Sequence, residues 1–343
     1  MWRGRRCRRS SFPEIATTSL SEWVVGREFP LDRIIDYTLT AASLPRQHLL
    51  HSNFGNPPLT LYWSEDFFID LLFWVDPRSD IHDHTFGGAF CVLRGRVLHD
   101  VVDFDCAESV PGKLKFGALR RRRIELLVPG DVRMIPYGSG LTHGTWHLSE
   151  PTLTLVIRTR HDPYDQHRYF KTMAVVQEAQ NRETLLNPLV VKRLAILRSL
   201  QKIDSRQAAV YARSLVKEPD LLTAYLYLEA YYACSFDLEL RLATAKEFRR
   251  KHGLRAGHLI AAAEEYALVR TIPWEIARDE SSRLLLAASR CLDNKMDVKD
   301  FLLRSNIHCR VRETGRRLAT ALASESNGSR AWAQRVEDVF DLR

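Results

Sequence analysis

The sequence lacks any apolar run approaching the ~18–20 residues that a membrane-spanning helix needs. Its longest apolar stretch, FFIDLLFWV, is interrupted by an aspartate and has the length of a strand. A basic segment with five arginines, MWRGRRCRRSSF, opens the sequence, but no hydrophobic signal-peptide region follows it. These absences argue against a membrane protein and against a secreted one.

Closely spaced cysteines are also absent. The 343 residues contain six cysteines, and no two of them have CxxC spacing. Small disulfide-stabilised domains and many zinc modules need such pairs. We therefore expect free thiols in a reducing compartment, and we predict a cytoplasmic protein.

Nucleic-acid motifs are missing too, although the net charge is +8. Much of that charge lies in the first segment and in the run from Arg120 to Arg123. A basic balance suits nucleic acid, yet no basic stripe interleaved with aromatic residues accompanies it. The run follows KLKFGAL and precedes IELLVPGD. We interpret it as charge that protects a strand edge from unwanted pairing, in preference to nucleic-acid binding.

Two patterns of hydrophobicity divide the chain. Apolar residues recur at helical spacing over 20–55 and again from about 165 onward. Between them, over 58–160, short β-rich runs alternate with Pro, Gly, Asp and Asn. The pattern predicts an α+β multidomain chain with an antiparallel barrel. We expect three parts: a flexible basic tail at 1–20, a β-barrel domain with a helical N-terminal lead-in at 21–170, and an all-α domain at 171–343.

Histidines concentrate in the β-rich segment, at positions 82, 84, 99, 143 and 147. Alternate side chains of a strand share a face, so His82 and His84 point the same way and Asp83 points the other way. A third ligand from a distant strand, His143, completes a mononuclear metal site. Three neutral imidazoles suit iron, zinc, copper or nickel.

The two histidine segments resemble the paired motifs of the cupin superfamily. DIHDHTFGGAFCVLRG is similar to the first motif, in which Gly95 is the closing glycine and Gly88 stands where a glutamate ligand is usual. GDVRMIPYGSGLTH is similar to the second motif, with a gap before His143 that is two residues shorter than usual. The resemblance covers about residues 55–165. It implies a double-stranded β-helix (cupin) barrel with His82, His84 and His143 as metal ligands.

Within the cupins, the lost glutamate and the IHDH and GLTH signatures most resemble the cysteine dioxygenase-like branch. The resemblance implies a mononuclear non-haem Fe(II) oxygenase that oxidises a small thiol or amino-acid-like substrate with O2. Zinc, nickel, copper or manganese are not excluded as the metal. Three neutral ligands leave the full +2 charge on the ion, and this charge attracts an anionic thiolate.

Several positions depart from that branch. Gly88 cannot form the cysteine–tyrosine crosslink of animal members, and the position of the tyrosine falls on Arg158. The segment before IHDH has Tyr62 and Trp63 but no carboxylate-binding arginine. We count Tyr62 among the candidate catalytic residues, together with Arg158 and His147. Arg158 either binds a substrate carboxylate in its place, or faces solvent together with Arg160.

His147 occupies a position where the second motif often has asparagine. We expect it to support the ligands, and a fourth-ligand role is the alternative. For His99, the pattern indicates a place inside the barrel or at its rim, with no assigned role. Cys91 is expected to face away from the metal and pack in the core.

A different class of function remains open. The chain is then a metal-binding cupin module without turnover, a sensor or scaffold whose helical half contacts a protein partner or a second copy. The tyrosine-rich tract TAYLYLEAYYAC marks such a contact or packs within its own domain. The ligand set is also compatible with a hydrolytic or isomerising zinc cupin.

Overall fold

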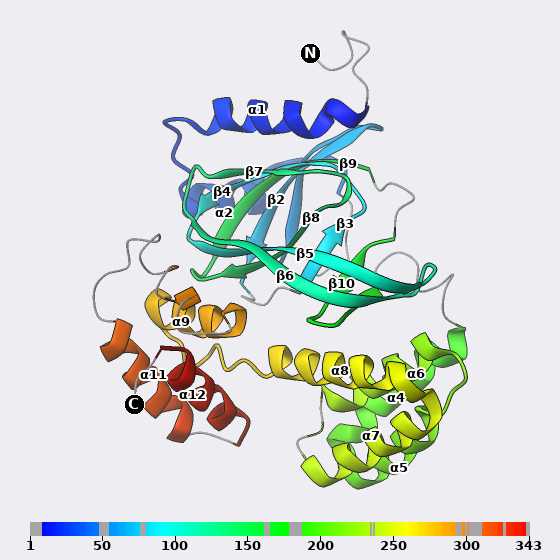
Figure 1. Ribbon diagram of the computed structural model, residues 1–343. Helices are drawn as coiled ribbons and strands as arrows, with labels where there is room; N and C mark the ends of the chain where they lie inside the picture. The colour runs from blue at the N-terminus through cyan, green and yellow to red at the C-terminus, as the bar shows by residue number, and fades with distance from the viewer. Residues whose placement is uncertain are drawn as a thin grey trace. The chain divides into compact units, whose positions relative to one another are not determined.

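The computed structural model describes most of the chain (Figure 1). The described residues are 9–47, 55–75, 80–160, 165–177, 187–233, 235, 237–292, 297–298, 301, 311–324 and 327–340. The chain divides into two units that alternate along the sequence. The first unit combines Met1–Val102, Arg121–Gln166 and Ala277–Val311; the second combines Asp103–Arg120, His167–Ile276 and Arg312–Arg343. The boundary expected near residue 170 lies close to one crossing between the units, at residues 166–167.

The first helix corrects the predicted tail. Residues 12–20 belong to α1 (Phe12–Val24), whose apolar residues Phe12, Ala16, Leu20 and Val24 recur at every fourth position. This spacing places them on one helical face, and all four are buried against a five-stranded sheet. The arginines before α1 concealed this amphipathic pattern; residues 1–8 lie outside the described part. A second helix, α2 (Leu31–Thr40), follows.

Five antiparallel strands form the sheet that α1 covers, in the order β1-β2-β9-β4-β7. Their bounds are β1 (Pro58–Trp63), β2 (Phe67–Trp74), β9 (Thr152–Thr159), β4 (Gly88–Arg94) and β7 (Val132–Ile135). Side chains alternate between the two faces of this sheet, apart from register shifts at Thr60/Tyr62 and Val92/Arg94. Cys91 and Leu155 face α1, as expected for Cys91, whereas Phe90 and Val156 face the barrel interior.

The other sheet has the order β10-β11-β6-β5-β8-β3. Its strands are β10 (His167–Tyr169), β11 (Met173–Val176), β6 (Leu114–Leu127), β5 (Val97–Val110), β8 (Gly138–His147) and β3 (Ile81–His84). In the first unit, Val97, Leu127 and Leu141 of this sheet pack against Leu72 and Val156 of the first sheet. The result is the predicted cupin-like β-barrel with N-terminal helices, followed by a helical region.

The arginine run lies within β6, which the sheet order places between β11 and β5. Arg120 forms ion pairs with Asp103 and Asp105, and Arg121 pairs with Asp100 at 2.8 Å. The pairing of β6 with β11 involves residues 114–116, which precede the arginine run, so the edge position of the run itself stays a prediction. Carboxylates of β5 neutralise part of the positive charge within the hairpin itself.

The described part of His167–Ile276 in the second unit has these α-helices after β11: α4 (Pro188–Ile203), α5 (Ser205–Leu215), α6 (Leu221–Tyr232), α7 (Leu238–His252) and α8 (Ala256–Arg270). Aspartate side chains cap three of them by accepting hydrogen bonds from backbone N–H groups, namely Asp204, Asp220 and Asp237. Tyr225, Tyr227, Tyr231 and Tyr232 of α6 are all buried. The tyrosine-rich tract therefore packs within its own unit.

A later helix, α9 (Glu280–Cys291), returns to the first unit. Arg283 holds it there, because its guanidinium donates to the carbonyl oxygens of Ala277 and Leu148 and to Glu150 Oε1 at 2.6 Å. The helices α11 (Val311–Ser324) and α12 (Asn327–Phe340) end the described chain. Within the described residues, we find no helix whose length and apolar character would let it span a bilayer.

Candidate metal centre

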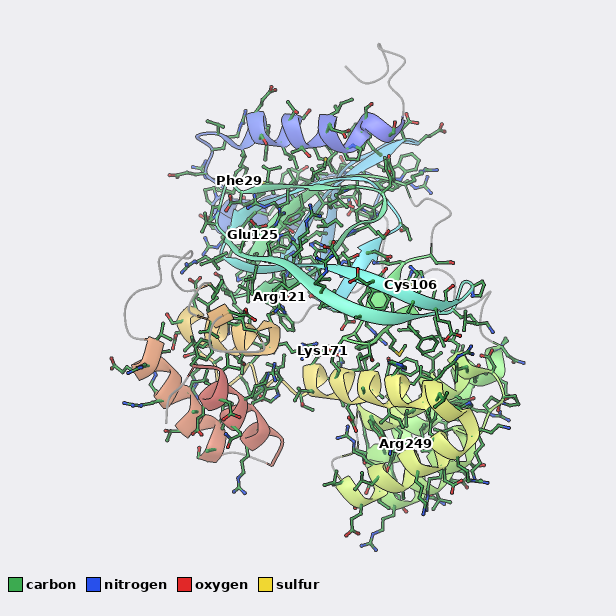
Figure 2. All side chains as sticks on the ribbon, in the orientation of Figure 1. Phe29, Cys106, Arg121, Glu125, Lys171 and Arg249 are labelled. Carbon is green, nitrogen blue, oxygen red and sulfur yellow. The ribbon has the colours of Figure 1, made fainter. Side chains whose placement is uncertain are left out.

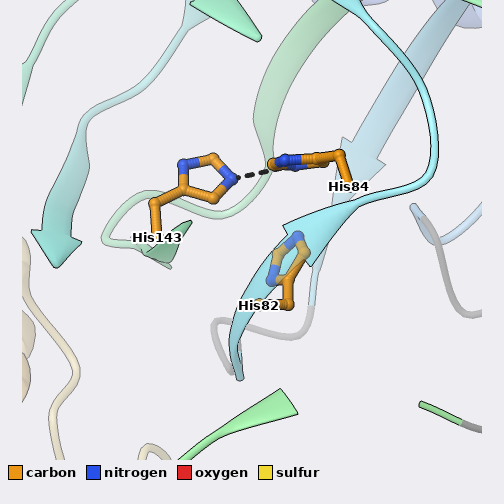
Figure 3. Close-up of side chains that lie close together, drawn as sticks. All are labelled: His82, His84 and His143. Carbon is orange, nitrogen blue, oxygen red and sulfur yellow. Dashed lines mark hydrogen bonds between the residues drawn. The ribbon is translucent and has the colours of Figure 1, made fainter. Parts of the chain in front are cut away.

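Three histidines from β3 and β8 converge on one point (Figure 3). The antiparallel pairing of the two strands sets His82 opposite His143, and strand alternation brings His84 to the same face. One ring nitrogen from each residue lies within 4.8 Å of the others, and Nε2 of His143 is 3.2 Å from Nε2 of His84. The structure thus brings together the three residues that the sequence singled out. They form a group that could hold a metal ion.

The hydrogen bond of His82 shows which nitrogen it offers. Its Nδ1 lies 2.9 Å from the carbonyl oxygen of Asp80. A carbonyl only accepts, so Nδ1 carries a proton and Nε2 is the nitrogen that can offer a lone pair. A lone pair on Nε2 is what a metal ion requires of a neutral imidazole.

Burial keeps the other two rings neutral. It lowers the pKa of His84 to about 3, with a further lowering from His82. The pKa of His143 falls well below its usual value, first through burial and then through its histidine neighbours. Both rings therefore carry a single proton and are neutral at neutral pH, which is the state that binds metal.

Gly88 occupies the position where cupins usually have a glutamate ligand, and the backbone around it leaves no room for a side chain. It pairs with Ile135 of β7 and Arg158 of β9. A Cβ atom there would lie 1.9 Å from the carbonyl oxygen of Ile157 and 2.9 Å from Cα of Arg158. The neighbouring backbone therefore leaves room for neither a carboxylate ligand nor a crosslinking cysteine.

Replacement of Gly88 by alanine is expected to lower the free energy of unfolding by about 1–3 kcal/mol, the usual cost of overpacking. The added methyl group must displace the β9 backbone because no flexible side chain stands in its way. Urea denaturation measures the change. The matched control is Gly257→Ala in α8, where nothing lies within 4 Å of the added Cβ. A Gly88 variant as stable as this control would contradict the prediction.

Arg158 is fully buried, with 1% of its surface exposed, so its predicted solvent-facing alternative is not observed. Its Nε donates to Oδ2 of Asp70 at 2.9 Å, and Oδ1 of Asp70 accepts from Thr60. The guanidinium carbon lies 5.2 Å from the ring centres of Phe68 and Phe86. Burial lowers the pKa of Arg158, and Asp70 opposes this shift. A buried aspartate thus already balances the charge predicted to bind a substrate carboxylate.

Tyr62 lies on β1, at the edge of the five-stranded sheet, whereas the three histidines belong to the other sheet. Its side chain is 45% exposed and stacks on Phe67 with ring centres 5.1 Å apart. A catalytic role for Tyr62 stays a prediction without a supporting contact.

His147 is also separate from the group. Four residues of strand, about 13 Å, lie between it and His143. Its ring stacks on Trp74 with ring centres 4.3 Å apart, and neither ring nitrogen has a hydrogen-bonding partner. The geometry supports neither a fourth-ligand role nor a contact with the ligands.

The burial of His147 has a consequence for stability. Burial lowers its pKa to about 3, whereas the unfolded chain binds a proton near pH 6.5. Stability should therefore fall as the pH drops from 7 toward 3, because the unfolded state gains the proton first. We expect His147→Phe to remove up to ~2 kcal/mol of the loss at pH 5. Denaturation of both proteins between pH 7 and pH 4.5 tests this; parallel pH curves would contradict it.

His99 contacts one of the candidate ligands and Glu125 contacts His99, and neither residue was assigned a role from the sequence. His99 of β5 has Nε2 at 2.7 Å from Nδ1 of His143, and its Nδ1 is 2.9 Å from Oε1 of Glu125 on β6. Arg133 donates to both oxygens of Glu125, from Nε at 3.0 Å and Nη2 at 2.8 Å. Partial burial would raise the pKa of Glu125, but hydrogen bonds from His99 and Arg133 hold it well below its usual range. His99 lies two residues from both Val97 and Val101, so strand alternation places it on the same face as these apolar residues. This was the signal in the sequence for an inward-facing His99.

No protein-family model matches the chain, and no curated protein matches it either. Several solved structures resemble part of it. A cupin-2 domain protein from Shewanella frigidimarina is 17% identical, with a TM-score of 0.22, over 32% of this chain and 85% of its own. Hydroquinone 1,2-dioxygenase from Sphingomonas sp. TTNP3 is 11% identical, with a TM-score of 0.25, over 31% and 67%. Oxalate decarboxylase from Bacillus subtilis is 19% identical, with a TM-score of 0.22, over 32% and 25%. Such values assign neither a family nor an activity.

Proposed function

We propose that this protein is a mononuclear non-haem iron oxygenase that oxidises a small thiol or amino-acid-like substrate with O2. The observation that carries the proposal is the ligand set. Three buried or half-buried histidines converge, and Gly88 excludes a carboxylate from the usual fourth position. The donor set is neutral, so a bound divalent ion keeps its full charge toward an incoming anion.

The neutral histidines fit a divalent ion by the chemistry of their donors. His82, His84 and His143 would hold it, and the ion would lower the pKa of a substrate thiol and bring it together with O2. The chain supplies the rest. His82 keeps its proton on Nδ1, bound to the Asp80 carbonyl, and thereby turns Nε2 inward.

Burial of the site supports chemistry that must exclude water. His84 and His143 are each only 4% exposed. Phe86 forms one wall, with its ring centre 5.0 Å from that of His84. The same ring lies 5.2 Å from the Arg158 guanidinium carbon, so Arg158 is our candidate for orienting the polar end of a substrate. Its Asp70 partner limits the net charge available for a carboxylate.

The direct test is metal analysis of anaerobically purified protein, followed by oxygen uptake with a panel of small thiols. We expect about one iron per chain and thiol-dependent oxygen consumption that His84→Ala abolishes. Stoichiometric zinc without any uptake would contradict an oxygenase. Metal binding with no turnover across the panel would favour the sensor or scaffold alternative.

A further inference from the structure

Four polar side chains from four strands form a hydrogen-bonded relay that ends at one of the candidate ligands. It consists of Arg133, Glu125, His99 and His143, supplied by β7, β6, β5 and β8. Each consecutive pair is within hydrogen-bonding distance, at 2.8, 2.9 and 2.7 Å. All four residues belong to the first unit. Glu125 is labelled on its strand in Figure 2.

The charge of Glu125, near the end of the relay away from His143, determines the direction of each hydrogen bond. Glu125 is held between two guanidinium groups, those of Arg133 and Arg123 at 2.8 and 3.2 Å, which favour its ionised form. An ionised carboxylate only accepts, so Nδ1 of His99 must carry a proton. His99 is fully buried, and burial disfavours a second proton on its ring, so we assign Nε2 as the acceptor of the next hydrogen bond.

The same logic determines His143. Its Nδ1 faces the Nε2 lone pair of His99, so Nδ1 must be the donor. The Nε2 of His143, on the opposite side of the ring, is then left with a lone pair that faces His84. The metal-binding tautomer is therefore selected before any ion arrives.

We propose that His99 and Glu125 are positioning residues that fix the tautomer and ring orientation of the ligand His143. The inference rests on the proposed metal site but concerns residues outside the ligand set. The glycine at position 88 makes this inference more specific. Among the described residues, no carboxylate joins the group of three histidines, and Glu125 would instead act on this group through His99. Partners of this kind typically contribute 10–100-fold to metal affinity.

The first experiment measures tautomers directly. Long-range ¹H–¹⁵N NMR of histidine-labelled protein, without metal and loaded with Zn²⁺, reports which nitrogen of each ring carries the proton. We expect the Nδ1–H form for both His99 and His143 in the two states. An Nε2–H form of His143, or a doubly protonated His99, in the metal-free protein would overturn the proposal.

The second experiment measures zinc affinity by competition with a chromophoric chelator. We expect His99→Phe to weaken binding ~10–100-fold, with a smaller, several-fold effect for Glu125→Gln. The control is Glu150→Gln, which removes a carboxylate of the same kind from the Arg283 pair, away from the histidines. Unchanged affinity in both test variants would contradict the proposal. A wild-type protein that binds no zinc would instead refute the metal site, while the NMR test of the relay still stands.

Discussion

Replacement of Arg158 by methionine should lower the free energy of unfolding by about 3–5 kcal/mol, the usual cost of breaking a buried ion pair. Methionine keeps the apolar stem but leaves Asp70 without its cation, and Asp70 is 0% exposed. Thr60 remains as a hydrogen-bond donor to one carboxylate oxygen, which does not balance a buried negative charge. Urea denaturation monitored by circular dichroism measures the change at pH 7.

Two further variants separate charge from packing. Arg160, two residues further along the chain, is exposed, and its guanidinium carbon lies 5.1 Å from the ring centre of Trp63. Arg160→Met should therefore cost less than ~1 kcal/mol. The double variant Asp70→Asn/Arg158→Met removes both charges and should recover most of the loss. A single Arg158 variant as stable as the Arg160 control would show that the pair contributes little.

The orientation of Arg158 illustrates how far the sequence alone could lead. Strand alternation ties Arg158 to Thr154 and Val156, opposite to Leu153 and Leu155. Whether the set with Arg158 or the set with Leu155 faces the barrel interior depends on which element covers the other face of the sheet. That cover is α1, whose residues 12–20 were expected in a flexible tail. The alternation was predictable, but the face that each set of residues occupies depends on α1, most of which falls within the predicted flexible tail.

The three converging histidines were predictable from strand alternation and from the two sequence motifs. His82 and His84 share a face by local geometry alone, and the two motifs supplied the third histidine. His99 and Glu125 are different, because their contact joins residues 26 positions apart on β5 and β6. The register of two 14-residue strands decides that contact. Alternation narrows the choice of partner only to every second residue.

The helical half shows a limit of another kind. Apolar periodicity predicted helices after the barrel, and the structure has them. The membership of α9 in the barrel unit depends on Arg283 reaching Leu148 and Glu150, more than 130 positions earlier in the sequence. Apolar spacing within a helix says nothing about which distant surface that helix covers.

Replacement of His82 by alanine should abolish tight metal binding, with a loss of zinc affinity greater than ~100-fold, which exceeds the effect of an outer partner. Only three protein donors converge in the described structure, and Gly88 leaves no space for a substitute carboxylate. His82 is the half-exposed member of the group, so its removal disturbs the core least. Competition with a chelator measures the affinity.

The same variant has a second readout in thermal stability. A ligand that binds only the folded protein at 100 times its Kd stabilises it by about 2.7 kcal/mol. Zinc should therefore raise the unfolding temperature of the wild-type protein and leave that of His82→Ala unchanged. His147→Ala is the matched control, because it removes a histidine of the same barrel that lies outside the group. It should retain the zinc-dependent shift from its own, lower starting stability. If only the His147 variant lost the zinc-dependent shift, the result would contradict a metal site at His82, His84 and His143.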